Sequence, residues 1–165
     1  MSEDPAGGPP QTPATRAAAE LGLRHEVRTI ERARSAAEAA ERVGVAPEAL
    51  LKTLVVRRAE DDHVLVLVPG PHRIAWPRLR AHLGVSRLSL PDAEAARDVT
   101  GYERGTITPL GTRRPLPVLA PAALAGVGDV AIGAGAHGVF IVADADELLA
   151  ALGADLGEVT DVDDG

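Results

Sequence analysis

Lys52 stands out because it is the only lysine among the 17 basic residues of this 165-residue chain. All the other basic residues are arginines, which indicates coding pressure that replaces lysine wherever arginine serves equally well. An ammonium group is compact and flexible, whereas a guanidinium is wider and planar, so the two are not equivalent at a small target. The retained lysine is therefore predicted to be a functional group. A solvated surface lysine is the alternative.

A second candidate is the segment 101–111, which contains three glycines and a proline. This composition predicts a loop with a specified backbone path rather than a floppy linker. Such a loop can direct amide and carbonyl groups at a ligand where a side chain would not fit. The alternative is a purely structural turn.

A third candidate is the glycine-rich segment from Gly133 to Gly138, which spells the G-x-G-x-x-G pattern of dinucleotide-binding proteins. That pattern needs a helix directly behind it to face the pyrophosphate. Residues 139–143 are instead typical of a strand. The segment is therefore predicted to be a hairpin turn whose backbone, with His137, lines a pocket. A dinucleotide oxidoreductase is the least favoured function class.

Several other chemistries are excluded by composition and spacing. The chain has no cysteine, which removes disulfides and thiolate sites and favours a reducing cytoplasm. No apolar run is long enough for a membrane span, so no membrane contact is expected. The histidines lack metal-ligand spacing and no serine lies in a nucleophile elbow, so neither a metal nor a cofactor is predicted. An enzyme of this composition has to act through positioning and electrostatics.

The net charge of −7 comes from the two ends of the chain, whereas residues 16–154 are neutral and 73–114 carry an excess of arginine. This distribution permits contact with nucleic acid through one face. The candidate phosphate contacts are Arg73, Arg78, Arg104, Arg113 and Arg114. With Trp76, Tyr102 and Phe140 as the only aromatic residues, a base-stacking platform is not expected.

Hydrophobic periodicity and capping signals predict an alternation of helices and strands. Helical segments are expected at 14–22, 35–43, 46–51, 74–83 and 91–99, with a last helix capped by Asp144 and running to Leu152. Strands are expected at 25–30, 53–56, 63–68, 87–90, 116–119, 129–132 and 139–143. These elements predict the α/β class, with a mixed β-sheet or a partly closed barrel and helices packed around it. We expect a disordered tail over 1–13, a single domain over 14–154 and an acidic tail over 155–165.

Four segments together resemble the YbaK/prolyl-tRNA synthetase-associated editing family. The resemblance covers about residues 15 to 160, with the elements in the same order. The matching segments are Lys52-Thr-Leu-Val-Val56, the Thr100–Gly111 pattern T-G-Y-x-x-G-x-I-x-P-L-G, Ala134-Gly135 before the strand 139–143, and the helix 36–40 followed by Val43-Gly44-Val45.

The resemblance implies a domain that hydrolyses the ester of mischarged aminoacyl-tRNA in trans, typically tRNA for proline carrying cysteine, alanine or another small amino acid. It implies that Lys52 holds the terminal adenosine end and that the Gly105 backbone meets the scissile ester. The implied partners are mischarged tRNA and a synthetase such as prolyl-tRNA synthetase. The remaining substrate-binding candidates are Thr53, Gly101, Tyr102, Thr106, Ile107, Pro109, Gly111, Gly133, Gly135 and His137.

Three positions either differ from the family pattern or have residues that vary between its editing branches. Thr106 stands where a second glycine often follows the loop glycine, and its bulk is expected to narrow the pocket. Gly133 stands where the cysteine-editing branch often has serine, while Thr53 matches that branch and the alanine-editing branch tends to have asparagine. The amino acid removed therefore stays open. The alternative function is a non-catalytic aminoacyl- or nucleotide-binding or regulatory module on the same fold.

Overall fold

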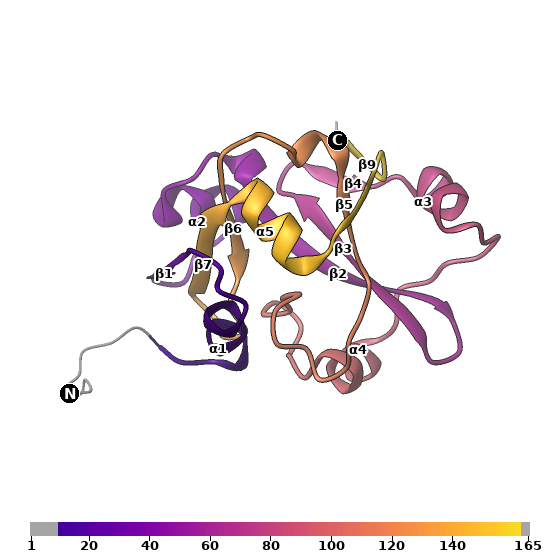
Figure 1. Cartoon of the computed structure of the whole chain (residues 1–165), viewed down its shortest axis with the longest axis horizontal. Coiled ribbons are helices and arrows are strands. Elements are labelled where there is room, and N and C mark those ends of the chain that lie inside the picture. The colour runs from indigo at the N-terminus through magenta and orange to yellow at the C-terminus, as the bar shows by residue number, and fades with distance from the viewer. Residues whose placement is uncertain (1–9, 163–165) are drawn as a thin grey trace.

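A mixed seven-stranded β-sheet runs through the computed structural model, which describes residues 10–162 (Figure 1). Its strand order is β1-β7-β6-β2-β3-β5-β8. Pairing is parallel between β6 and β2, β3 and β5, and β5 and β8, and antiparallel elsewhere. The strands are β1 (Glu26–Thr29), β2 (Leu50–Ala59), β3 (Asp62–Pro69), β5 (Val118–Pro121), β6 (Asp129–Gly133), β7 (Val139–Asp144) and β8 (Asp155–Gly157). The predicted α/β fold with a mixed sheet is confirmed, and the sheet is open rather than closed into a barrel.

The β2–β3 hairpin forms the centre of the sheet because both strands are rich in valine and leucine. Strand residues alternate between the two faces. On the first face, Leu65 and Leu67 join a core cluster with α1 (Pro13–Glu20), α4 (Ala93–Thr100) and α5 (Ala145–Leu152). On the second face, Val64, Val66 and Val68 pack with α3 (Trp76–Leu83), beside a separate cluster under α2 (Ala36–Val43). In Figure 1, α3 and α4 accordingly lie on opposite sides of the hairpin.

Polar caps begin the helices where the sequence predicts them. Ser35 Oγ accepts a hydrogen bond from the Glu38 amide (3.1 Å), and an Asp144 carboxylate oxygen accepts one from the Glu147 amide (3.2 Å). The chain also forms two 3₁₀ turns, η1 (Pro47–Ala49) and η2 (Ala122–Leu124). The predicted helical turn at 46–51 is thus a single 3₁₀ turn, and strand β2 begins at Leu50.

The acidic tail predicted over 155–165 is wrong for residues 155–162. Strand β8 pairs with β5 in parallel, and β9 (Thr160–Val162) pairs with β4 (His72–Ile74). Strand β8 is an edge of the seven-stranded sheet, whereas β4 and β9 form a separate two-stranded sheet. These strands are short and mainly polar, so their stability comes from backbone pairing that hydrophobic periodicity does not report. Residues 163–165 lie outside the described residues.

Other boundaries differ from prediction for local reasons. The tail predicted over 1–13 ends inside the fold, because Thr12 caps α1 and Pro13 is its first residue; residues 1–9 lie outside the described part. The helix predicted from Ile74 begins at Trp76, since Ile74 pairs in β4. The strand predicted at 87–90 is reduced to one bridge between Ser89 and Arg57.

Candidate functional site

The sheet has an opening along one edge of β2. Strand β2 pairs with β6 only at Leu50 and Leu51, and pairing on this edge resumes at Arg57, which exchanges two backbone hydrogen bonds with Ser89 (2.8 and 3.1 Å). Successive strand residues direct their backbone groups to alternate sides. Thr53 and Val55 therefore point their N–H and C=O groups toward the same edge as Arg57, into the opening.

The loop 101–111 closes over this opening and is braced internally. The buried Tyr102 hydroxyl donates to the carbonyl oxygens of Leu110 (2.6 Å) and Gly111 (3.2 Å). Thr106 donates its amide (2.9 Å) and its hydroxyl (2.8 Å) to the Glu103 carbonyl oxygen. Burial raises the pKa of Tyr102 to about 12, so the phenol keeps the proton that it donates. The specified backbone path predicted for this loop is confirmed.

Between the β2 edge and the loop lies a cavity of about 280 Å³, which we term the loop cavity. It brings together candidate residues from three distant segments: Lys52 and Thr53 from β2, Gly105 and Ile107 from the loop, and Gly133 from the end of β6. The rest of its wall is mainly aliphatic. The polar groups that the predicted residues bring to it are glycine backbone, the Thr53 hydroxyl, the Lys52 ammonium and the Arg104 guanidinium.

Gly105 is exposed in the loop cavity with a φ of 90°, in the left-handed region that favours glycine. A Cβ at this position would lie 3.5 Å from His137 Cε1, an ordinary contact. The His137 ring therefore stands beside the loop glycine. The backbone at Gly105 is accessible to a ligand because no side chain covers it.

Thr53 carries a buried hydroxyl oxygen that has no hydrogen-bond partner among the described residues. The residue is 8% exposed and lines the loop cavity. A buried polar group left without a partner costs about 1–3 kcal/mol. A ligand whose polar group reaches Thr53 would recover part of that free energy, which makes this hydroxyl a candidate contact.

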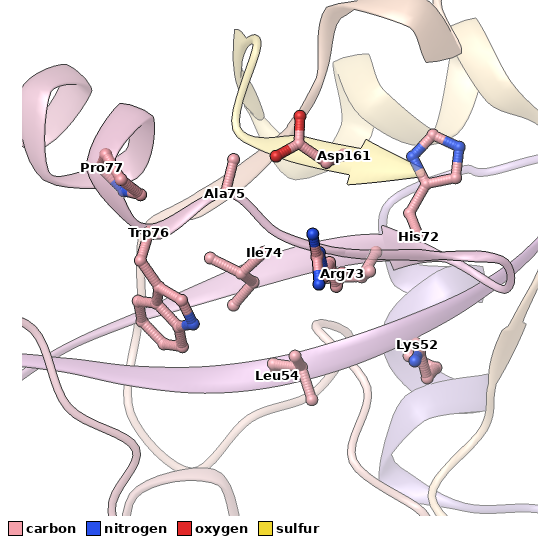
Figure 2. Close-up of a pocket in the computed structure, with 10 residues that line it drawn as sticks. Lys52, Leu54, His72, Arg73, Ile74, Ala75, Trp76, Pro77 and Asp161 are labelled. Atoms are coloured by element: carbon pink, nitrogen blue, oxygen red, sulfur yellow. The ribbon is translucent and has the colours of Figure 1, made fainter. Parts of the chain in front are cut away.

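Lys52 lies on the opposite face of β2 from Thr53. On that face Leu50 packs under α2 and Leu54 packs beside α3, so the exposed Lys52 falls in the gap between the two clusters. Lys52 and Leu54 line the loop cavity and also a second cavity of about 500 Å³, the tryptophan cavity, shown in Figure 2. The two cavities meet along this stretch of β2.

A sequence profile for the aminoacyl-tRNA editing domain matches residues 30–151, which include β2, the loop and the turn after β6. The chain belongs to the aminoacyl-tRNA editing domain family. The resemblance of the lysine and loop motifs to the YbaK-like editing proteins is thereby confirmed.

Solved and curated relatives agree with this assignment. The structure of a candidate trans-editing enzyme for prolyl-tRNA synthetase is 28% identical, with a TM-score of 0.81 over 92% of this chain and 99% of that one. Proline–tRNA ligases of Levilactobacillus brevis and Xanthomonas axonopodis pathovar citri are 33% identical over 100 residues and 28% over 130 residues. The matches cover 61% and 79% of this chain but only 17% and 22% of the ligases, so the chain spans about a fifth of these curated relatives.

Several predicted residues of this editing domain lie outside the lining of the loop cavity and support it instead. Gly101 ends α4 with a φ of 84°. A Cβ at Gly135 would lie 2.6 Å from Tyr102 Cε1, so the tyrosine ring packs directly on that glycine. A Cβ at Gly111 would lie 2.5 Å from the Pro13 carbonyl oxygen, which seats the start of α1 against the loop. These close approaches explain the glycine pattern without a ligand.

Thr106 does not narrow the loop cavity as expected. Its side chain is buried, bonds to Glu103 and does not line the cavity. Pro109 is likewise buried in the loop, and the exposed His137 lies outside the lining. The predicted turn after β6 is a hairpin that leads directly into β7, so it lacks the helix of a dinucleotide site.

The arginines predicted as phosphate contacts separate into different environments. Arg104 lines the loop cavity and Arg73 lines the tryptophan cavity. Arg78 is structural, since it pairs with Asp161 and donates to the carbonyl oxygens of Glu158 (2.8 Å) and Thr160 (3.0 Å). The remaining two predicted arginines, Arg113 and Arg114, are exposed after the loop.

Sequence reasoning missed two groups of residues. Leu90, Pro91, Ala93 and Phe140 line the loop cavity, but as apolar residues they carried no chemical signal. A second group of arginines surrounds a separate cavity of about 550 Å³: Arg57, Arg58, Arg80 and Arg87. The sequence could not predict this group, because it forms only once α3 packs on the sheet. Among residues 10–162 no cluster of potential metal ligands occurs, and no helix there is long and apolar enough to cross a bilayer.

Proposed function

We propose that this editing domain hydrolyses mischarged aminoacyl-tRNA in trans, with tRNA for proline carrying cysteine, alanine or another small amino acid as substrate. The observation that carries the proposal is the convergence of Lys52 and the Gly105 backbone on one small cavity. Its lining contains no serine, cysteine or histidine that would act as a nucleophile. This composition fits hydrolysis by water better than covalent catalysis.

In the proposed reaction, water adds to the ester carbonyl carbon and the bond to the ribose oxygen then breaks. The ribose oxygen leaves with a proton, and a group of the substrate or water relays that proton. Backbone N–H groups fixed beside the reacting carbonyl stabilise negative charge that develops on its oxygen. The open β2 edge at Thr53 and the loop at Gly105 are the candidate donors. Lys52 holds the terminal nucleotide through its positive charge.

Selectivity for a small amino acid follows from the walls of the loop cavity. A hydrophobic pocket distinguishes near-isosteric side chains by only about 1–3 kcal/mol, so charging errors require a second sieve. A Cβ at Gly133 would lie 3.7 Å from the Ile107 carbonyl oxygen. The absence of a side chain at Gly133 therefore leaves room beside the loop. We place the aminoacyl group there.

We also propose that the predicted domain 14–154, lengthened to residues 12–162 by the α1 cap and strands β8 and β9, is the functional unit and that prolyl-tRNA synthetase is its partner. The proline–tRNA ligases of Levilactobacillus brevis and Xanthomonas axonopodis carry the similar segment within a longer sequence. A separate protein with the same domain would complement a synthetase that releases mischarged tRNA. The acidic residues of β8 and β9 belong to the fold and extend this unit to at least Val162.

The test is deacylation of alanyl-, cysteinyl- and seryl-tRNA for proline, with prolyl-tRNA as the correctly charged control. The wild-type protein is compared with Lys52→Ala and Lys52→Arg. We expect one mischarged species to be hydrolysed and the activity to be lost in both variants. Hydrolysis that survives both substitutions would remove Lys52 from the site.

A non-catalytic binding module is the second candidate, and Gly133 favours it because the loop cavity lacks the serine found in one editing branch. This module would bind uncharged or charged tRNA ends and hydrolyse none of the four species. Unchanged levels of all four aminoacyl-tRNAs, together with measurable tRNA binding, would select it.

A further inference from the structure

The tryptophan cavity combines the groups that recognise a nucleotide. Leu54, Val68 and Ile74 give it an apolar floor, and Trp76, the only tryptophan of the chain, stands at one end. In the view of Figure 2, Arg73 lies between Trp76 and Lys52. The volume of the tryptophan cavity, about 500 Å³, lies in the range of small-molecule sites.

The charge of this cavity is positive once its ion pair is counted. Asp161 is its acidic residue, and Asp161 is already paired with Arg78 on the neighbouring helix. Among the described residues neither Lys52 nor Arg73 forms an ion pair. His72 bonds to the Thr160 hydroxyl (3.1 Å), which holds the β4–β9 wall in place. Arg73 lies opposite Asp161 in the β4–β9 pairing, but the ion pair of that carboxylate is with Arg78, so Lys52 and Arg73 give the cavity two cations against one acid.

We propose that the tryptophan cavity binds the nucleotide that precedes the terminal adenosine of a single-stranded RNA end, with its base against Trp76 and its phosphate near Lys52 and Arg73. The proposal rests on the proposed function, which places the ester in the loop cavity. The two cavities share Lys52 and Leu54, so an RNA strand that leaves the loop cavity enters the tryptophan cavity next. One aromatic face and two cations suffice for one nucleotide without a larger stacking platform.

Trp76 provides a direct readout because its intrinsic fluorescence is the only tryptophan signal. The probe is the uncharged RNA trinucleotide CCA, titrated at low salt and followed by Trp76 emission. We expect saturable quenching, and we expect Arg73→Gln to lower the slope of log affinity against log salt by about 0.7, the value for one phosphate on a single strand. The matched control is Arg34→Gln, an exposed arginine that lines neither cavity.

Because Trp76 packs partly on the core, Trp76→Leu is measured separately with labelled CCA after its fold has been checked by circular dichroism. We expect binding about tenfold weaker, the order of one lost base stack. No quenching by CCA, or an identical salt slope in Arg73→Gln and wild type, would overturn the proposal.

The deacylation assay separates failure of this site from failure of the proposed function. Hydrolysis of mischarged tRNA without quenching by CCA, and with an unchanged KM in Trp76→Leu, refutes the nucleotide site and leaves the function intact. Quenching that depends on Arg73, in a protein that deacylates nothing, supports the nucleotide site and refutes the proposed function.

Discussion

The two cavities that meet at Lys52 use different parts of the chain. The loop cavity is walled by strand edge, glycine backbone, aliphatic side chains and the buried Thr53 hydroxyl. The tryptophan cavity is walled by an indole ring, Arg73, His72 and an acidic residue. The first offers fixed dipoles and a tight shape, with Arg104 in its lining, whereas the second offers Arg73 and the flat face of an indole ring.

From this difference we expect different tasks for the two cavities on either side of β2. Fixed dipoles act on charge that develops in the transition state, so changes in the loop cavity should alter kcat. Charge and stacking act on the bound nucleotide in every state, so changes in the tryptophan cavity should alter KM. Lys52 belongs to both cavities and should affect both constants.

The largest effect is expected for Lys52→Ala. Removing one partner of a charged contact costs about 2–5 kcal/mol, so kcat/KM for mischarged tRNA should fall by about 30-fold or more. Lys52→Arg keeps the charge but not the shape and should restore little of the loss. Steady-state deacylation kinetics measure both variants. A decrease in kcat/KM of less than threefold in Lys52→Ala would show that Lys52 does not contact the substrate.

Gly105→Ala should follow, with a fall in kcat of about 10- to 100-fold and little change in KM. An alanine at a φ of 90° is strained, and a shift of the loop by about 1 Å misplaces the reacting groups. The matched control is Gly126→Ala, an exposed glycine with a φ of 76° and no neighbour within 4 Å. Equal losses of activity in the two variants would show that strain alone, and not position in the loop cavity, is responsible.

Thr53→Val should separate stability from activity. Valine has the same shape without the unpartnered hydroxyl, so the free energy of unfolding should rise by about 1 kcal/mol. Deacylation should nevertheless slow by about fivefold, because the ligand loses a hydrogen bond of about 1 kcal/mol. Urea denaturation and kinetics measure the two changes, with the exposed Thr29→Val as control. A variant that is more stable and fully active would show that the hydroxyl does not contact substrate.

Gly133→Ser should change selectivity more than rate. The nearest atoms to a Cβ there are the carbonyl oxygens of Ile107 (3.7 Å) and Thr106 (3.8 Å), so serine fits and narrows the loop cavity. The ratio of kcat/KM between seryl- or cysteinyl-tRNA and alanyl-tRNA should shift by about 10-fold, the effect of roughly one methylene in a pocket. An unchanged ratio would place the aminoacyl group elsewhere.

Tyr102→Phe should have the smallest effect on activity at neutral pH, since Tyr102 lies outside the lining of the loop cavity. Tyrosine ionises at a pH of about 10 when unfolded, and burial raises the folded pKa to about 12. Because the folded pKa is the higher one, the wild-type stability from this group is full below pH 10 and falls as the pH rises toward 12. Thermal unfolding of Tyr102→Phe should show a shallower alkaline fall, and identical alkaline curves would contradict this account.

The sequence predicted the loop cavity better than the tryptophan cavity. Lys52, the loop glycines and Gly133 carried chemical or conformational signals that could be interpreted without a fold. Arg73 and Trp76 become neighbours of Lys52 only through β4 and its pairing with β9, a pairing between short polar strands that are far apart in the sequence. Tyr102 and Gly135 were interpreted as ligand contacts because a glycine required by an aromatic ring resembles one required by a substrate.

We propose that the substrate passes from one cavity to the other at Lys52, and a truncated substrate tests this division most directly. Deacylation of mischarged tRNA is compared with that of the same amino acid on adenosine alone, for wild type, Gly105→Ala and Trp76→Leu. We predict that the Gly105→Ala defect persists on both substrates, whereas the Trp76→Leu defect appears only with full-length tRNA. A Trp76→Leu defect of equal size on aminoacyl-adenosine would contradict the division of the substrate at Lys52.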